Sequence, residues 1–341
     1  MILQPDEYRS RQLKYAPLEK VGDCALQQCG VFHSELRFVA DTGNVIFRAE
    51  ADNRAYGVRI YKEQFRTIPE IYGELNWLLD LQKHTNIIVP QPLSTASGQF
   101  VQEITAPSIE GPFQVVLFHW ISGEIIGTNI EVETARQIGK LMAELHTHAA
   151  AFELPTDSFR DMTDWRGMGH FTANLTLTRL SRIEGFLNQE QLELCEEAAK
   201  RVAVIINEVD DQQNFGLIHS DLHTNNCLSH KGKISIIDFE DCQFAPFTCD
   251  IAITLSSFDN FPDQAILCKA FLQGYAERRE LPQNFTEEVE AFMIERRLRL
   301  IRWVATWPSV EHFSFGWRII NNSLQSCQHY IESESSRSSW Q

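Results

Sequence analysis

Residues 217–241 read Leu-Ile-His-Ser-Asp-Leu-His-Thr-Asn-Asn-Cys-Leu-Ser-His-Lys-Gly-Lys-Ile-Ser-Ile-Ile-Asp-Phe-Glu-Asp. This stretch predicts a short apolar strand, a loop, and then a tight β-hairpin that turns at residues 229–233. Asp221 directly follows the strand, Asn226 comes five positions later, and Asp238 comes another twelve positions on. The hairpin therefore predicts that Asn226 and Asp238 lie side by side.

These three side chains carry the groups that phosphoryl transfer from a magnesium nucleotide requires. A carboxylate orients the attacking hydroxyl and accepts its proton late, because the transition state is loose. Two hard oxygen ligands hold a Mg²⁺ ion that bridges the terminal phosphates. We therefore expect Asp221 to act as the base, and Asn226 and Asp238 to be the metal ligands. A lone aspartate in such a loop is more often a plain capping residue, and it is the complete spacing that favours catalysis.

Two further residues are expected to support this loop. His219 is expected to pack and hydrogen-bond the loop in place rather than to bind a metal. Asp250, in Cys-Asp-Ile-Ala, opens a helical run and could be a helix cap. The interpretation we favour is that Asp250 hydrogen-bonds the backbone of the catalytic loop. His223 lies inside the loop, and the sequence leaves open whether it faces a substrate.

The first part of the chain predicts a small unit that combines a sheet and a helix. Its strand-like runs are separated by turn-rich segments, and they lie at 33–40, 45–50, 56–61, 99–105 and 114–121. A surface helix is expected at 6–28, and an apolar stripe predicts a second helix at 68–83. We expect a five-stranded antiparallel sheet with this second helix inserted after the third strand.

Ser122-Gly123 is the expected boundary between two lobes. We predict a nucleotide-binding lobe at 1–122 and a catalytic and substrate-binding lobe at 123–341. Beyond the boundary the pattern is mainly helical, interrupted by the hairpin after Asp221. The helices expected there lie at 131–152, 176–188, 189–209, 262–279, 285–306 and 316–332.

The first lobe contains a candidate pair for positioning phosphates. Arg59 lies on the third predicted strand, and Glu74 follows fifteen positions later on the inserted helix. A cation held by a carboxylate would present a fixed charge to the α- and β-phosphates. Glu70 is the alternative acidic partner. A surface salt bridge of little energetic value is the alternative interpretation of the pair.

Two other segments are candidates for nucleotide contact. The turn at 41–44 would cover the phosphates, which makes Gly43 and Asn44 candidates, although one glycine alone is a weak motif. Residues 117–121 end the last strand before the boundary, and their backbone could bind the adenine edge. Phe118 or Trp120 would then add apolar contact, but an ordinary strand at a domain border would look the same.

Taken together, these motifs resemble the aminoglycoside phosphotransferase and choline kinase-like family, a small-molecule branch of the protein-kinase-like fold. The resemblance rests on Leu-Ile-His-Ser-Asp-Leu-His-x-x-Asn, Ile-Ile-Asp-Phe-Glu-Asp and Cys-Asp-Ile-Ala, with weaker support from residues 138–146. It covers the chain from about 30 to 330. It implies a bilobal α+β fold, ATP and Mg²⁺ as cofactors, transfer of the γ-phosphate to a hydroxyl, and the residue roles given above.

Two departures from the kinase pattern refine this expectation. Arg59 stands where many kinases have lysine, so phosphate contact survives with a different geometry. Glu240 replaces the glycine of Asp-Phe-Gly, and no Ala-Pro-Glu segment follows. Glu240 and the missing segment favour a constitutively assembled small-molecule kinase over a regulated protein kinase. The hydroxyl acceptor that we expect is a small metabolite or antibiotic that can bear an amine. An atypical serine/threonine protein kinase is the alternative, and a catalytically silent nucleotide-binding regulator is a third reading.

The acceptor is expected to bind the second lobe between the catalytic loop and helices from 155–185 and 285–325. Aromatic residues there could enclose a cationic amine, but they could equally belong to the core. These candidates are Trp165, Trp303, Trp307, His312, Phe315 and Trp317.

Composition limits the remaining possibilities. The 341 residues suit about two domains, and no stretch approaches the roughly 18 apolar residues of a membrane span. The N-terminus shows no secretion signal, and eight scattered cysteines suggest reduced thiols in a cytoplasmic protein. The net charge of −16 argues against a nucleic-acid partner. It would favour cationic substrates or only maintain solubility. We expect a small-molecule partner and no membrane partner, and the oligomeric state stays open.

Overall fold

The structure is a computed structural model that describes residues 5–32, 35–41, 43–61, 66–106, 109, 111–153, 177–209, 214–259, 261–306 and 314–333. Within these residues the chain forms two compact units. The first unit contains the described residues up to Gly127, Phe152 and Glu153, and Asn225–Glu240. The second contains Thr128–Ala151, the described residues that lead up to Thr224, and those from Asp241 onward. The chain therefore passes from the second unit to the first directly after Thr224.

A six-stranded antiparallel sheet forms the centre of the first unit. Its strands are β1 (Glu35–Ala40), β2 (Val45–Ala51), β3 (Arg54–Ile60), β4 (Gln91–Leu93), β5 (Val101–Ile104) and β6 (Phe113–His119). Their order is β1-β2-β3-β6-β4, and β5 also pairs with β6. The five predicted strands are present. The sixth strand, β4, was not expected, because it is three residues long and contains Pro92, which cannot donate to a ladder.

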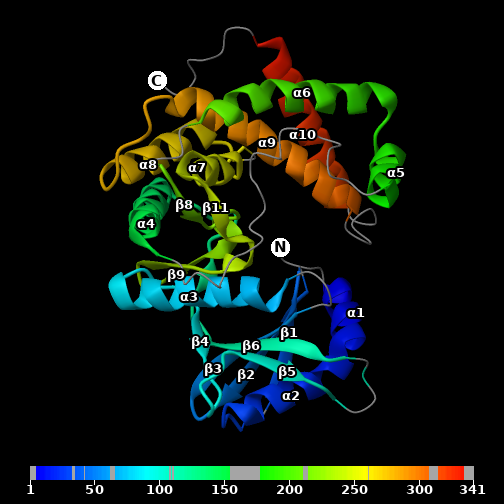
Figure 1. The fold of residues 1–341 in the computed structure, drawn as a ribbon, viewed down its shortest axis with the longest axis vertical. Helices are drawn as coiled ribbons and strands as arrows, with labels where there is room; N and C mark the ends of the chain where they lie inside the picture. The colour runs from blue at the N-terminus through cyan, green and yellow to red at the C-terminus, as the bar shows by residue number, and fades with distance from the viewer. Residues whose placement is uncertain are drawn as a thin grey trace. The chain divides into compact units, whose positions relative to one another are not determined.

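Helices lie on both faces of this sheet (Figure 1). They are α1 (Pro5–Tyr15), α2 (Glu19–Gln28) and α3 (Ile68–His84), with a short 3₁₀ helix at Ala16–Leu18 between the first two. Val58 of β3 lies in the apolar core that α2 closes. Its neighbour Arg59 points to the other face, where it meets Glu74 of α3. The alternation of a strand therefore places Arg59 on the α3 side of the sheet.

The predicted hairpin belongs to the first unit. It consists of β9 (Cys227–His230) and β10 (Lys233–Ile236), and β7 (Glu124–Ile125) pairs with β9 on its outer side. Lys231 and Gly232 form its two-residue turn with φ values of 49° and 76°. Positive φ at both positions is what a tight hairpin turn of the favoured type requires.

Two contacts fix the hairpin within the unit. The backbone N–H of Ile236 donates to the carbonyl of Ile88 at 3.0 Å. Trp77 of α3 packs edge-on against Phe239, with ring centroids 5.3 Å apart. Both aromatic side chains are fully buried, so the chain just after Asp238 is held by apolar packing.

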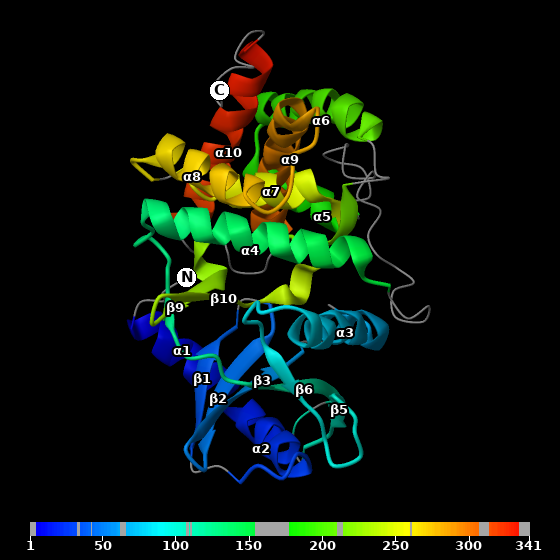
Figure 2. The ribbon, with the colours of Figure 1, turned by 90° about the vertical axis from the view of Figure 1, so that its left-hand side faces the viewer.

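The second unit is mainly helical. Its helices are α4 (Val132–Ala151), α5 (Leu177–Phe186), α6 (Gln189–Glu208), α7 (Phe247–Ser256), α8 (Gln264–Ala276), α9 (Phe285–Thr306) and α10 (Ser314–Glu332). Figure 2 shows α8 alongside α4, while α9 contacts α6, α7 and α10. The antiparallel strands β8 (Phe215–Ile218) and β11 (Gln243–Pro246) pack against α4 and α7.

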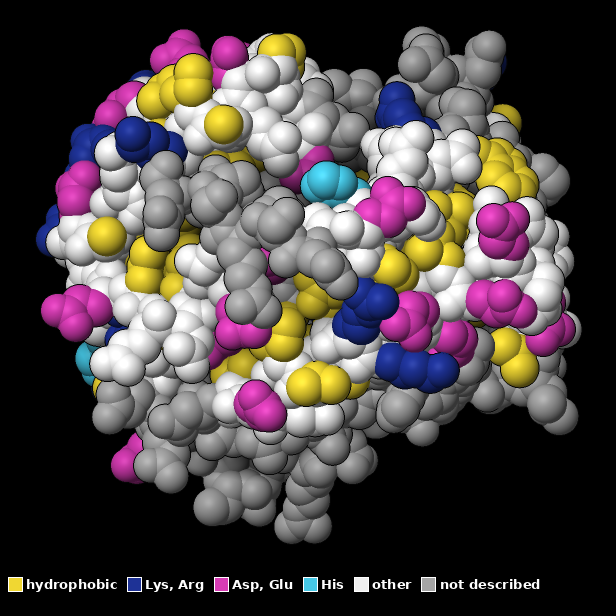
Figure 3. Space-filling view, turned by 90° about the horizontal axis from the view of Figure 1, so that it is seen from above, with side chains coloured by type: hydrophobic (Ala, Val, Ile, Leu, Met, Phe, Trp, Pro, Cys, Tyr) yellow, Lys and Arg dark blue, Asp and Glu magenta, His cyan; other side chains and the backbone are white. Residues whose placement is uncertain are grey.

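None of the helices in the described parts of the chain has the length and apolarity needed to cross a membrane. All eight cysteines are described and free, and six of them are buried. In the described part of the face shown in Figure 3, acidic and basic side chains lie interspersed. The negative charge is therefore not gathered into one patch on that face.

Candidate active site

The loop that carries Asp221 is anchored by Asp250 of α7. The backbone N–H of His219 donates to Oδ2 of Asp250 at 3.0 Å, and that of Ser220 donates to Oδ1 at 2.9 Å. Ser220 has a φ of 67°, a left-handed conformation that is unfavourable for residues other than glycine. Asp250 is the fourth residue of α7 rather than its N-cap. Its carboxylate therefore fixes the backbone just before Asp221.

A buried histidine supports Asp250 from α4. Nε2 of His146 lies 3.2 Å from Oδ2 of Asp250, and Nδ1 lies 2.9 Å from the hydroxyl of Tyr275. Burial lowers the pKa of His146, although Asp250 acts to raise it. Burial alone would raise the pKa of Asp250, but the bond to His146 is the main influence that lowers it. The sequence analysis did not predict this role of His146. The one local indication was that a histidine lies on the apolar face of the predicted helix.

Asp221 itself lies among basic groups of the second unit. Its Oδ1 accepts a hydrogen bond from Nη2 of Arg296 on α9, and its Oδ2 lies 3.4 Å from Nε2 of His223. Burial alone would raise the pKa of Asp221, but Arg296, and after it His223 and His219, hold the pKa below its usual range. The carboxylate is therefore ionised at neutral pH. Arg296 is 75 residues away in the sequence, and no local pattern could have indicated it.

The hairpin of the first unit brings Asn226 next to Ile237, the residue that precedes Asp238. Ile236 pairs with Cys227 in the ladder, and the backbone N–H of Ile237 donates to the carbonyl of Asn226 at 2.9 Å. Asp238 follows with a φ of 67°. An amide oxygen and a carboxylate are ligands that Mg²⁺ accepts, so the chemistry of these two residues fits a hard divalent cation.

Arg59 is held by Glu74. Nη1 of Arg59 donates to both carboxylate oxygens of Glu74, at 2.7 and 2.9 Å. The two side chains are only 8% and 4% exposed, so this is a buried ion pair and not a surface one. The guanidinium also lies over the ring of Phe118, 4.8 Å from its centroid. Glu70, the other acidic candidate, closes a capping box with Thr67 at the start of α3.

Glu240, which follows the hairpin, lies near both Arg59 and the β1–β2 turn. Burial alone would lower the pKa of Arg59, but Glu74, together with Glu240 and Asp238, raises it above its usual value. Glu240 also approaches the turn, because a Cβ atom at Gly43 would lie 3.3 Å from its Oε2. Residues from three distant parts of the sequence therefore meet in the first unit.

Asn44, which follows Gly43, is buried in this turn. Asn44 is only 3% exposed. Neither the amide nitrogen nor the amide oxygen has a hydrogen-bond partner among the residues that the structure describes. A buried polar group without a partner is costly. Such a group fits a position that a ligand completes.

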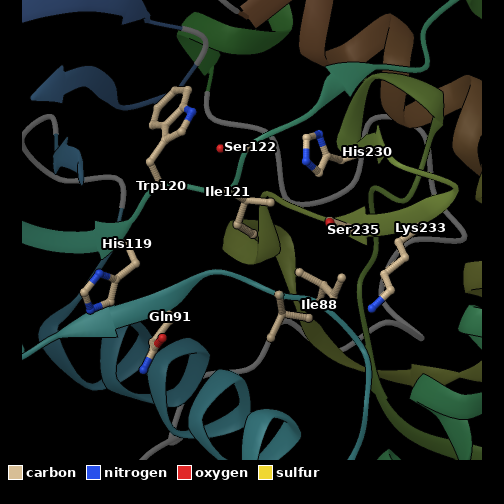
Figure 4. Close-up of a pocket in the computed structure, with 10 residues that line it drawn as sticks. Ile88, Gln91, His119, Trp120, Ile121, Ser122, His230, Lys233 and Ser235 are labelled. Carbon is tan, nitrogen blue, oxygen red and sulfur yellow. The ribbon is translucent and has the colours of Figure 1, made fainter. Parts of the chain in front are cut away.

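Trp120 lines a cavity of about 360 Å³ (Figure 4), and Arg48 lies over its ring, 5.2 Å from the centroid. His119 pairs with Gln91 of β4, and both line this cavity. Phe118 is not among the residues that line this cavity. Its other lining residues are Ile88, Val89, Ile121, Ser122, His230, Lys233 and Ser235.

The aromatic candidates for acceptor binding are only partly described. Trp303 and Trp317 are 37% and 44% exposed. Trp317 packs against Phe186 of α5, with centroids 5.3 Å apart. Trp165, Trp307 and His312 lie outside the described residues, and the side chain of Phe315 is not described.

The first unit is an antiparallel sheet with an inserted helix, whose Glu74 binds Arg59 of the third strand. Together with a mainly helical second unit, this is the protein-kinase-like fold of small-molecule phosphotransferases. The profile of the Phosphotransferase enzyme family matches residues 35–283. The chain belongs to this family and is a phosphotransferase. The fold class and the family expected from the sequence are thus confirmed.

Several known proteins are similar over most of their length. Amicoumacin kinase of Bacillus subtilis (strain 168) is 24% identical over 284 residues, which cover 80% of this chain and 81% of that protein. Homoserine kinase of Parvibaculum lavamentivorans is 23% identical, with 77% of this chain and 76% of that protein covered.

Solved structures show the same fold. The microcompartment-associated aminopropanol kinase superposes with a TM-score of 0.71 at 22% identity, with 92% of this chain and 97% of that chain covered. Amicoumacin kinase hAmiN, in complex with AMP-PNP, Ca²⁺ and Ami, gives a TM-score of 0.74 at 19% identity, with 96% of each chain covered. At such identities the likeness extends to the fold alone.

Proposed function

We propose that this chain transfers the γ-phosphate of ATP to a hydroxyl group of a small molecule, with Mg²⁺ as the metal. The observation that supports the proposal is the backbone bond between Ile237 and Asn226, since Ile237 directly precedes Asp238. The neighbouring structure with AMP-PNP and Ca²⁺ supports a nucleotide together with a divalent cation.

The first unit supplies the groups for the nucleotide. Asn226 and Asp238 are the metal ligands, and the bound Mg²⁺ would neutralise charge on the terminal phosphates. Arg59, oriented by Glu74, binds the α- and β-phosphates as a buried, fixed charge. The amide of Asn44, which has no hydrogen-bond partner among the described residues, completes its hydrogen bonds on the nucleotide.

Two assignments from the sequence extend this proposal. Gly43 contacts the phosphates at the β1–β2 turn, and the end of β6, with Phe118 or Trp120, borders the adenine. The division at Ser122-Gly123 into a nucleotide-binding lobe and a catalytic lobe stays a prediction.

The second unit supplies the base. Asp221 orients the acceptor hydroxyl and takes its proton late in the transfer. The bonds from the backbone to Asp250, and from the N–H of Asp221 to Nδ1 of His219 at 3.3 Å, fix the direction of this carboxylate. Such positioning is the main contribution that a protein makes to phosphoryl transfer.

An ADP-release screen tests this proposal. Its panel would contain homoserine, ethanolamine, choline, methylthioribose and aminoglycosides. We expect at least one acceptor to raise ADP release above the acceptor-free rate in a Mg²⁺-dependent manner, with phosphate recovered on that acceptor. Phosphate found only on protein would instead indicate the atypical serine/threonine protein kinase. Nucleotide binding without any transfer would indicate a regulator.

Glu74→Gln should weaken nucleotide binding more than Glu70→Gln does. The first substitution leaves Arg59 buried without its carboxylate, and loss of one partner of a buried pair costs about 3–5 kcal/mol. We expect the KM for ATP to rise about tenfold or more, together with a lower melting temperature. Glu70→Gln is the matched control on the same helix, because glutamine also serves in a capping box. Equal KM values for the two variants would contradict the role of Arg59 and Glu74.

A further inference from the structure

Asp221 faces a positively charged side chain that the proposed chemistry does not use. Arg296 of α9 donates from Nη2 to Oδ1 of Asp221. The two side chains are 17% and 22% exposed, so a small molecule can reach both of them. Within the described part of the chain, Asp221 is the one ion-pair partner of Arg296.

The neighbouring arginines of α9 are engaged elsewhere. Arg297 forms an ion pair with Asp259 and donates to the carbonyl of Ser256. Arg299 pairs with the fully buried Glu295, with Nε and Oε2 2.9 Å apart. Arg296 is therefore the arginine of this group that is directed at the catalytic loop.

A second nitrogen-containing group stands beside Asp221. Nε2 of His223 lies 3.4 Å from Oδ2 of the carboxylate. Its other ring nitrogen, Nδ1, is buried and has no hydrogen-bond partner among the described residues. Asp221 is thus flanked on one oxygen by a guanidinium and on the other by an imidazole.

We propose that the acceptor carries a carboxylate close to the hydroxyl that receives the phosphate, and that Arg296 binds this carboxylate. The inference rests on the proposed role of Asp221. A guanidinium presents five N–H donors in a planar fork that suits a carboxylate, and the bond from Nη2 to Asp221 uses only one of them. Because Arg296 and Asp221 touch, the hydroxyl and the carboxylate must be only a few bonds apart. A short hydroxy acid or hydroxy amino acid meets this condition.

The charge of Arg296 decides which acceptor group binds next to it, and the net charge of the whole chain matters less. An ammonium group next to Arg296 would meet a like charge at contact distance, where repulsion is strongest. The net charge of −16 is spread over the whole chain, and salt screens exposed charges beyond about 10 Å. An amine on the acceptor is therefore compatible with the site only if it lies away from Arg296.

Matched acceptors test this inference. L-homoserine differs from 3-aminopropan-1-ol by its carboxylate, and L-serine differs from ethanolamine in the same way. We expect the intact enzyme to have the higher kcat/KM with the carboxylate-bearing member of at least one pair. Arg296→Gln should reduce this preference about tenfold to a hundredfold, mainly through the KM of the acceptor. Arg296→Lys should restore part of it, since the charge returns without the fork.

Arg297→Gln is the matched control, because it removes an ion-paired arginine from the adjacent position of the same helix. We expect this variant to keep the preference within each pair. A structural role of Arg296 would change both members of a pair equally. Preference of the intact enzyme for the carboxylate-free alcohols, or a preference that Arg296→Gln leaves unchanged, would overturn the inference.

A calorimetric titration with L-homoserine separates this inference from the proposed function, since binding needs no turnover. Binding that Arg296→Gln weakens supports the carboxylate subsite even if no ADP is released, and in that case only the proposed function fails. Phosphorylation of carboxylate-free alcohols with no binding of either amino acid would overturn the subsite and leave the proposed function intact.

Discussion

Replacing Asp221 by asparagine is expected to lower kcat about 10²- to 10⁴-fold, the range that a positioned general base contributes. Asparagine has the same shape but cannot accept the proton of the acceptor hydroxyl. The bonds from His219 and Ser220 to Asp250 do not involve this side chain, so the loop should keep its conformation. Steady-state ADP release gives kcat, and a titration with an ATP analogue should show that nucleotide affinity is retained.

This substitution also leaves Arg296 without its carboxylate, so the loss of activity needs a control. Asp259→Asn removes the partner of Arg297 at the next position of α9, and it should leave kcat near that of the parent enzyme. Full activity of Asp221→Asn would remove this residue as the base. Equal losses in both variants would show that an unpaired arginine, and not a missing base, is responsible.

Asp238→Asn should lower kcat/KM for Mg·ATP about 100-fold or more, because an anionic metal ligand is lost and metal contributes several kcal/mol to such a transfer. The backbone should tolerate the change. Asp238 has a φ of 67°, and asparagine adopts the left-handed region as readily as aspartate does. A titration of activity against Mg²⁺ should show a higher half-saturating concentration for the variant.

Asp52→Asn provides a matched control for the backbone argument. Asp52, in the turn between β2 and β3, also has a positive φ, of 50°, and the function we propose gives it no role. This variant should keep the Mg²⁺ dependence of the parent enzyme. An unchanged Mg²⁺ dependence in Asp238→Asn would exclude Asp238 as a metal ligand.

The hairpin shows which part of the site could be predicted from local sequence. Asn226 and Asp238 are joined by a short ribbon, and its two-residue turn at Lys231 and Gly232 sets the register of β9 and β10. With the register fixed, the residues that face each other follow from counting. Arg59 and Glu74 were predicted as a pair for a similar reason. The alternation of a strand sets the side of the sheet on which Arg59 lies, and the period of a helix sets the side of the helix on which Glu74 lies.

Strand β4 and the burial of Asn44 in the β1–β2 turn were harder to foresee. Pro92 argues against a strand at this position. The three residues of β4 form a strand only because they pair with β6, and no local sequence pattern indicates this pairing. Asn44 was a weak candidate from its turn. Its burial without a hydrogen-bond partner is visible only after the chain has folded around it.

Covalent spacing and local periodicity were enough to establish the kind of chemistry, because Asp221, Asn226 and Asp238 lie within one short run of residues. The surroundings of Asp221 could not be obtained in this way. Arg296 binds Asp221 and His146 binds Asp250, from positions 75 and 104 residues away in the sequence. Their contacts depend on how α4, α7 and α9 pack, and packing is a property of the whole core rather than of any local pattern.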